Sequence, residues 1–461
     1  MSAIGARDGT VRVPRSAISG IRWPGILADD GATMLAMQYQ LERTQWWSAA
    51  ELRAAQLLQL RPLVRHAFES VPFYRERFER CGIDPRQKFD FGDFERLPLL
   101  KRADLQGAPT QLQSTQVPPE HGPVTDGYTS GSTGAPVHFY TTSVCQFFWR
   151  ALTLRHHLWH ERDLGAKFGA IRITAEEGLM PGWGSATDVA FVTGPGAQLG
   201  FRADIDTQLT WLHQQRPRYL LSYPSNILAL VRRSVELRMP ALPIAEVLTF
   251  GEMLPADLRA AVRAAWDAPV TDAYSSQEVG YIALQCPQCE HYHVQAEGML
   301  VEVLDNGGKP CAPGQTGEVV VTDLHNLAMP LIRYRIGDFA TVGEACGCGR
   351  GLPVLTRIVG RVRNMLVMPD GALRFPRIGT KELSHIAPIL QHQLVQKAPD
   401  CIEVNLVVAQ ALSEEAQERV GAAIRQSLGY PFRLMFRYHA SIERSASGKF
   451  EDFISEVART A

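Results

Sequence analysis

The spacing of apolar residues predicts long helices in the first third of the chain. Over residues 48–80 apolar side chains recur at helical spacing, and Ser48 is a suitable N-cap. A second run of this kind covers residues 143–164. Residues 1–45 lack a sustained period and are expected to form an irregular lead-in, with short strands around residues 10–14.

The middle of the chain has a different pattern. Between about residues 168 and 270, short β-rich runs such as 219–222 and 247–250 alternate with helical patterns such as 255–266. This alternation predicts βαβ units with largely buried strands.

Beyond Gly298 the pattern changes to strand, turn and strand, as at residues 300–304 and 317–323. A meander or a small barrel fits this part, which ends at about residues 359–367. A strand at 403–408 and a helix at 413–428 then indicate a compact α/β tail.

The expected fold class is therefore α/β, with more than one domain because 461 residues exceed one ordinary core. Residues 46–359 would form a large N-terminal domain with mixed sheets and a small barrel-like part, including two cysteine pairs within residues 286–348. Residues 360–461 would form a small, mobile α+β C-terminal lid.

Composition excludes several classes of function. Hydrophobic residues make up 45% and charged residues 21%, as in ordinary globular proteins, and the formal net charge is -1. That charge argues against nucleic acid or an anionic membrane as a partner. The chain has neither a run of roughly 20 apolar residues nor a signal-like N-terminus, so a cytoplasmic location is expected.

A loop of hydroxyl residues and glycines, residues 128–134, is the first candidate for chemistry. Glycines allow positive φ, which turns backbone N–H groups toward an anion, so the loop is suited to hold phosphate. A solvent-exposed Ser/Gly loop is the alternative. Residues 128–134 are not a Walker A loop, because they do not end in the sequence Gly-Lys-Ser/Thr.

Four further motifs follow, each of which could be a turn when taken alone: Asp272-Ala-Tyr-Ser-Ser-Gln-Glu-Val-Gly280, Tyr334-Arg-Ile-Gly-Asp338, Gly360-Arg-Val-Arg-Asn364 and Arg444-Ser-Ala-Ser-Gly-Lys449. In this order and spacing, the five motifs resemble the adenylate-forming superfamily of acyl-CoA synthetases and nonribosomal adenylation domains. The chain is most similar to the phenylacetate–CoA ligase group and its capsule-biosynthesis relatives. Residues 46–48, 71–75 and 329–334 add to the resemblance, which covers about residues 40–461.

The resemblance implies a role for each motif. Lys449 would stabilise charge developing between the carboxylate and the α-phosphate, and Glu278 would hold Mg²⁺ on the phosphates. Tyr274 would stack on adenine, and Asp338 would bind the ribose hydroxyls with Arg361 beside it. The resemblance assigns phosphate binding to Ser130, Gly131, Ser132, Thr133 and Gly134. Other nucleotide contacts fall to Glu252, Ser275, Ser276 and Gln277, and the acyl pocket to Tyr223, Phe250, Gly251 and Gly280, with Glu252 and Ser275 nearby.

The chain departs from the family pattern at three places. Ala135, Pro136 and Val137 stand where many members have a lysine after the phosphate loop, and Gln277 replaces the usual threonine before the glutamate. Arg363-Asn364 replaces an acidic pair at the interdomain hinge. These differences bear on the substrate and the second half-reaction.

Two close cysteine pairs point to a zinc site. Cys286 and Cys289, with His291 and His293 just beyond, are followed by Cys346 and Cys348; turns of this kind close tetrahedral Cys/His sites. The resemblance assigns Cys286, His293, Cys346 and Cys348, and Cys289 could replace His293. No catalytic base accompanies them, so the site would be structural, with reduced, unliganded cysteines as the alternative. His156 and His160, one helical turn apart, are expected at the surface.

The function expected from the resemblance is ATP-dependent activation of a small carboxylic acid, with an aromatic acid favoured, to an acyl-adenylate and transfer to coenzyme A, releasing AMP and pyrophosphate. ATP, Mg²⁺, structural Zn²⁺ and coenzyme A are the implied cofactors and cosubstrates. An enzyme that transfers AMP or makes an amide or ester without coenzyme A, and a non-catalytic zinc-stabilised scaffold, are the alternatives. The sequence leaves a homodimer open.

Overall fold

The computed structural model describes residues 12–107, 109–129, 136–173, 177–361, 365–371, 373–374, 376, 383, 385–442 and 452–457. The helices are α1 (Asp29–Thr44), α2 (Ala49–Ser70), α3 (Pro72–Arg80), α4 (Phe91–Arg96), α5 (Arg102–Gly107), α6 (Pro109–Leu112), the 3₁₀ turn η1 (Pro119–His121), α7 (Ser143–Trp159), α8 (Ile205–Gln215), α9 (Pro224–Glu236), α10 (Leu258–Trp266) and α12 (Glu414–Leu428).

The described strands belong to one large sheet and three smaller ones. The large sheet contains β3 (Phe168–Arg172), β4 (Gly178–Met180), β5 (Gly196–Gly200), β6 (Tyr219–Ser222), β7 (Glu246–Phe250), β8 (Val270–Ser276), β9 (Gly280–Gln285), β10 (Tyr292–Val294), β11 (Met299–Leu304), β12 (Thr316–Asp323), β13 (Tyr334–Val342) and β14 (Val354–Arg361). The smaller sheets pair β1 (Val124–Tyr128) with β2 (His138–Thr142), pair β15 (Leu366–Val367) with β16 (Leu373–Arg374), and combine β17 (Ile389–Ala398), β18 (Cys401–Val408), β19 (Arg433–Tyr438) and β20 (Phe453–Ser455).

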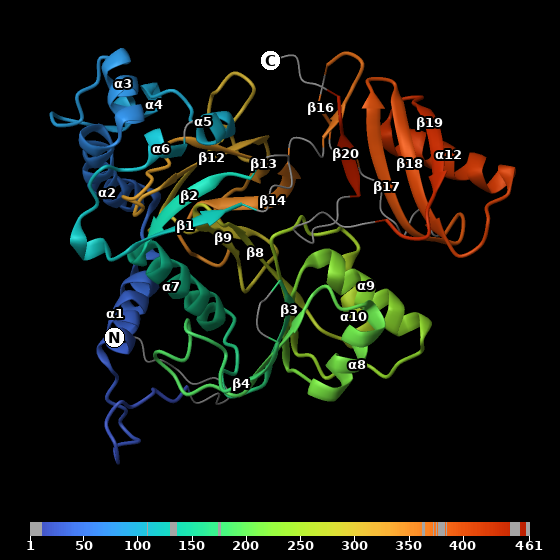
Figure 1. Ribbon diagram of the computed structural model, residues 1–461, viewed down its shortest axis with the longest axis horizontal. Coiled ribbons are helices and arrows are strands. Elements are labelled where there is room, and N and C mark those ends of the chain that lie inside the picture. The colour runs from blue at the N-terminus through green and yellow to red at the C-terminus, as the bar shows by residue number, and fades with distance from the viewer. Residues whose placement is uncertain are drawn as a thin grey trace.

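The large sheet has a parallel half and an antiparallel half. Strands β3, β5, β6, β7 and β8 pair in parallel, as the alternating pattern predicts. Figure 1 shows α8, α9 and α10 on one side of these strands and α1 and α7 on the other. From β9 onward the pairing is antiparallel, and the predicted meander continues this same sheet, with β11 pairing only with β12 among the described strands.

The N-terminal helices follow from local sequence. Ser48 accepts a hydrogen bond from the Glu51 backbone and Glu51 returns one to Ser48, which is a capping box at the start of α2. Pro72 then begins α3, because proline lacks the N–H that a continuing helix needs but fits a first turn. The helical prediction for residues 48–80 is thus confirmed as two helices.

The expectation of an irregular lead-in is wrong for residues 29–44, which form α1. Only Gly31, Met34, Gln38 and Leu41 of this helix are buried, and Gln38 donates to the Ala151 carbonyl at 2.8 Å. A buried face this narrow, with large apolar side chains only at Met34 and Leu41, gives little hydrophobic periodicity. Residues 10 and 11 lie outside the described residues, and Pro14 makes a single antiparallel bridge to Phe191.

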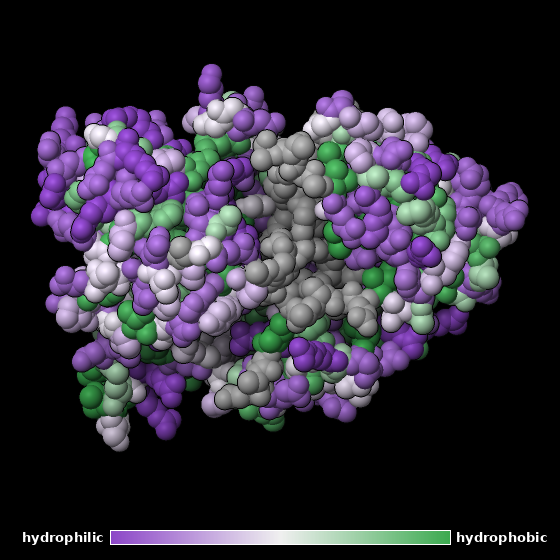
Figure 2. All heavy atoms as spheres, turned by 45° about the horizontal axis from the view of Figure 1, so that its top comes forward, coloured by the Kyte–Doolittle hydropathy of each residue, from purple (hydrophilic) through white to green (hydrophobic). Residues whose placement is uncertain are grey.

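The C-terminal residues form their own sheet and core. Strand β18 and helix α12, with Ser413 as its N-cap, confirm the predicted tail. Ile402, Val404, Leu406, Val420 and Ile424 are buried in one cluster there. Hydrophilic side chains cover most of the outer face shown in Figure 2, as expected when apolar residues gather in such clusters. None of the described helices is long and apolar enough to cross a membrane.

Helix α7 buries polar residues that were expected outside. His156 and His157 are both buried, and His160 is nearly so, which corrects the surface prediction for His156 and His160. Their partner is the fully buried Arg162, which donates to the His157 Nδ1 at 3.2 Å and forms two hydrogen bonds with Glu246, at 2.7 and 2.8 Å. Periodicity does not distinguish a polar residue facing a buried partner from one facing water.

This cluster makes stability sensitive to acid. Burial, together with the nearby Arg162 charge, holds the pKa of His157 well below its usual value of 6.5. Below about pH 6.5 the unfolded chain therefore binds a proton that the folded chain does not, so stability falls as pH falls, by up to about 1.4 kcal/mol per pH unit for each such histidine.

We predict that His157→Gln flattens the dependence of the unfolding free energy on pH between pH 6.5 and 5, by up to about 1.4 kcal/mol per pH unit. Urea denaturation of wild type and variant across this range measures it. His138→Gln is the matched control, because the His138 side chain is only partly buried, at 22% exposure, and lies outside the cluster. Parallel curves for wild type and His157→Gln would contradict the prediction.

Candidate active site and cysteine–histidine cluster

The candidate nucleotide residues meet where the parallel strands end. Carboxyl ends of parallel strands share one edge of a sheet, and ligands of α/β proteins bind along it. Tyr223 follows β6, Gly251 and Glu252 follow β7, and the turn of residues 277–279 follows β8.

Tyr274 and Asp338 are in direct contact although they are far apart in sequence. The Tyr274 hydroxyl donates to the Asp338 Oδ2 at 2.8 Å. Asp338 lies on β13 and pairs in register with Arg361 on β14. Gly337 and Gly360 beside them have φ of 88° and 90°, a conformation that glycine adopts without strain. The structure thus brings together Tyr274, Asp338 and the backbone of Arg361. The family resemblance assigns all three residues to nucleotide binding.

Glu278 lies in the turn of the β8–β9 hairpin, only 4% exposed. Among the described residues its carboxylate has no hydrogen-bond or ion-pair partner. A carboxylate that pairs with no described side chain is available to bind a cation. The Ser276 hydroxyl, two residues earlier, is also buried without a partner in the described part of the chain. Ser275 and Ser276 end β8, Gln277 is exposed in the turn, and Gly280 begins β9 with φ of 85°.

Aromatic side chains line the neighbouring strand ends. The rings of Tyr223 and Phe250 lie 4.9 Å apart, and Phe201 contacts Tyr223 edge-on at 5.6 Å. Burial raises the pKa of Tyr223, so its hydroxyl stays neutral. Glu252 accepts from the Ser225 backbone at 2.9 Å, at the N-terminus of α9, where the helix dipole favours a negative charge.

Trp149 is a neighbour of this region that the sequence did not single out. Its ring lies 5.1 Å from that of Tyr281, and a methyl group on Gly280 would meet it at 3.5 Å. It lies on the helical pattern of α7, where nothing separates it from an ordinary packing residue. The phosphate-loop residues Ser130, Gly131, Ser132, Thr133 and Gly134, and Lys449, lie outside the described residues.

The predicted zinc ligands also converge. The ligand atoms of Cys286, His293, Cys346 and Cys348 all lie within 4.8 Å of one another. The Cys286 and Cys346 sulfurs are 3.9 Å apart, and the Cys348 sulfur is 3.3 Å from His293 Nε2. Sulfurs bound to one tetrahedral zinc at about 2.3 Å lie about 3.8 Å apart, so this donor set fits the ion. Cys289 falls instead in a second group with His291 and Cys346.

Asp272 connects the cluster to the hairpin. It is buried in β8, where it accepts from the Thr249 and Tyr292 hydroxyls, each at 2.7 Å. Burial raises its pKa to about 6. Tyr292 is next to His293, so these bonds fix the ligand-bearing strand β10 against the strand that carries Tyr274.

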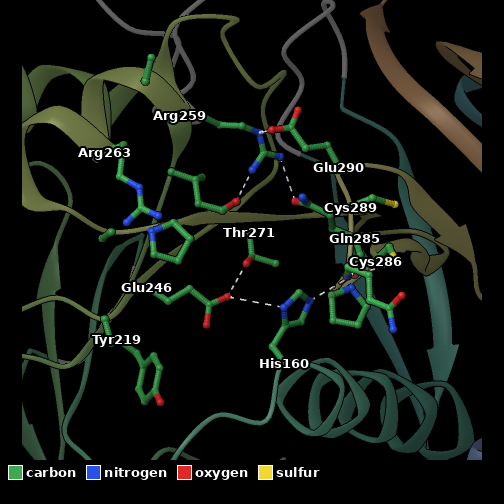
Figure 3. Close-up of a pocket in the computed structure, with 17 residues that line it drawn as sticks. His160, Tyr219, Glu246, Arg259, Arg263, Thr271, Gln285, Cys286, Cys289 and Glu290 are labelled. Carbon is green, nitrogen blue, oxygen red and sulfur yellow. Dashed lines mark hydrogen bonds and ion pairs between the residues drawn. The ribbon is translucent and has the colours of Figure 1, made fainter. Parts of the chain in front are cut away.

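A cavity of about 720 Å³ opens at the opposite, amino edge of the parallel strands. Figure 3 shows His160, Glu246 and Thr271 on one side of it, and Arg259 and Glu290 on another. Cys286 and Cys289 belong to its lining.

Comparison with known proteins finds relatives among coenzyme A ligases. No protein-family model matches the chain. A phenylacetate–coenzyme A ligase of Thermus thermophilus is 26% identical over 455 residues, covering 90% of this chain and 98% of that protein. Another from Aromatoleum evansii is 27% identical over 344 residues, covering 73% and 76%.

Solved structures show the same fold. A 2-hydroxyisobutyryl-CoA ligase in the postadenylation state, in complex with 2-HIB-AMP, matches with a TM-score of 0.72 at 22% identity, covering 90% of this chain and 92% of that one. The anthranilate-CoA ligase AuaEII matches with a TM-score of 0.53 at 17% identity, covering 71% and 64%. In sequence and in fold, the chain is therefore similar to the phenylacetate–CoA ligase group of adenylate-forming enzymes.

Proposed function

We propose that this protein activates a carboxylic acid with ATP and transfers the acyl group to coenzyme A. In the first step a carboxylate oxygen bonds to the α-phosphorus and the bond to pyrophosphate breaks. In the second, the thiolate of coenzyme A bonds to the acyl carbon and AMP leaves. The observation that carries the proposal is the hydrogen bond from Tyr274 to Asp338, with Glu278 in the turn that follows the strand of Tyr274.

Each of these residues has a proposed role in the first step. The Tyr274 hydroxyl orients the Asp338 carboxylate, which would accept hydrogen bonds from the ribose. Glu278 would hold Mg²⁺, which prefers carboxylate oxygens and supplies charge neutralisation on the phosphates when bound. The sequence alone adds Lys449 and the loop of residues 130–134 to the residues proposed for this step.

The acid we propose is small and aromatic. The contacts among Tyr223, Phe250 and Phe201 at the strand ends support this, because aromatic rings favour flat apolar partners in offset or edge-on contact. The test is ATP-dependent pyrophosphate release over a panel of carboxylic acids, with and without coenzyme A. Release with at least one aromatic acid, and thioester formation only with coenzyme A, is expected. No release with any acid would overturn the proposal.

We also propose that zinc occupies the Cys286, His293, Cys346 and Cys348 set as a structural ion. Burial raises the pKa of the Cys286 thiol to about 12, so a thiolate there needs a bound cation. The His293 side chain is fully buried, which suits a closed structural site without an open position.

Glu278→Gln should lower adenylate formation by at least about 10²-fold, because the change removes the charge that faces the metal and phosphates but little volume. Pyrophosphate exchange measures it, and thermal unfolding checks that the fold is kept. Glu236→Gln, the same change at an exposed position on α9, should leave exchange unaltered. Wild-type exchange by Glu278→Gln would show that the turn has another role.

Lys449→Ala should separate the half-reactions. A charge-assisted bond made mainly in the transition state contributes about 2.7–4 kcal/mol, so pyrophosphate exchange should fall by about 10²–10³-fold. Thioester formation from preformed acyl-adenylate and coenzyme A should persist, because the proposed movement of the C-terminal lid would carry Lys449 away before that step. Lys397→Ala on β17, where Lys397 forms a surface ion pair with Glu456, is the control. Equal loss in both assays would contradict the assignment.

Cys348→Ser should reduce tightly held zinc and lower the free energy of unfolding by several kcal/mol, since a structural ion contributes to folding directly. Metal analysis and thermal unfolding of protein purified without chelator measure the two effects. Cys81→Ser, at a thiol outside the cluster, should change neither. An unchanged zinc content in Cys348→Ser would exclude that residue as a ligand.

A further inference from the structure

The cysteine–histidine cluster holds more ligands than one zinc ion can use. Six side chains are candidates, and they form two groups that share one sulfur. The first group is the proposed zinc set. The second consists of Cys289, His291 and Cys346, whose ligand atoms also all lie within 4.8 Å of one another.

Cys289 is placed beside the first group without belonging to it. Its sulfur is 3.5 Å from the Cys346 sulfur. If Cys346 is a zinc-bound thiolate, Cys289 has two chemical options at that distance: it keeps its proton and donates it to Cys346, or it loses its proton to a second cation that Cys346 bridges.

His291 favours the second option. Its Nδ1 is buried and has no hydrogen-bond partner among the described residues. A buried ring nitrogen without a partner is unfavourable, whereas a bound metal satisfies it. Glu290, between the two ligands in sequence, turns toward Arg259 instead, with its carboxylate 3.4 Å from the guanidinium (Figure 3).

Charge balance points the same way. One Zn²⁺ with three thiolates and a neutral histidine has a net charge of −1. A second divalent ion with the Cys289 thiolate and neutral His291 adds +1, which makes the cluster neutral. Neutral clusters are favoured where burial penalises net charge.

We propose that Cys289, His291 and bridging Cys346 form a second metal position for Zn²⁺ or a similar borderline divalent ion. Three protein ligands leave its fourth position open to water, so this ion is held more weakly than the first. The proposal rests on the proposed zinc set for its shared ligand, and it is independent of the ligase reaction.

Counting zinc on the intact folded chain by native mass spectrometry tests this. Metal-free protein titrated with Zn²⁺ should bind two ions in wild type. Cys289→Ser and His291→Gln should each bind one, and a weak chelator should remove one ion from wild type and none from these variants. Cys81→Ser, at a cysteine outside both groups, should bind two.

Three results would overturn the second position. Wild type that saturates at one ion, or at none, leaves no second site. Two ions in both Cys289→Ser and His291→Gln would exclude these ligands. Loss of all zinc in both variants would place them in the tight site. If Cys289→Ser does not fold, the number of zinc ions bound by His291→Gln tests the second position by itself. Pyrophosphate release, measured on the same samples, shows separately whether the proposed ligase activity stands.

Discussion

The antiparallel pairing of β9 with β8 is the contact on which the rest of the large domain depends. On one side β8 pairs in parallel with β7, and on the other it pairs antiparallel with β9. The two halves of the sheet join there. The turn of this hairpin carries Glu278, its first strand carries Tyr274, and its second strand leads directly into Cys286. The hydrogen bonds from Tyr292 and Thr249 to buried Asp272 fix the same strand from both sides.

Most of the regular structure could be predicted from the sequence, because periodicity and capping are local. The capping box at Ser48, the proline at the start of α3 and the alternating strands of the parallel half all carry such signals. Helix α1 has only a weak hydrophobic periodicity, because its buried face is narrow and includes Gln38. Register in the antiparallel half has no local signal, so the family resemblance put Arg361 near Asp338 but only the structure shows that the two pair across β13 and β14.

The site was predictable as a set of motifs but not as a geometry. The order of the motifs pointed to Tyr274, Glu278 and Asp338, yet nothing in the sequence shows that the Tyr274 hydroxyl reaches Asp338. The buried pair of Arg162 and Glu246 was missed because each residue alone looks like a solvated charge. Their two hydrogen bonds make burial tolerable, and removing one partner of such a pair typically costs about 3–5 kcal/mol. His291 was likewise hidden beside the better-matched His293.

The direction of β9 has a consequence for the protein's own chemistry. An acyl-adenylate is an electrophile that reacts readily with thiolates, and the cluster contains several cysteines close together. Strand β9 has six residues between the Glu278 turn and Cys286, which at about 3.3 Å per residue separates the two by about 20 Å. The sheet itself lies between them, with one group at its carboxyl edge and the other at its amino edge. At the proposed site an acyl-adenylate would therefore form across the sheet from the most closely grouped of the described cysteines, and this separation would limit self-acylation there.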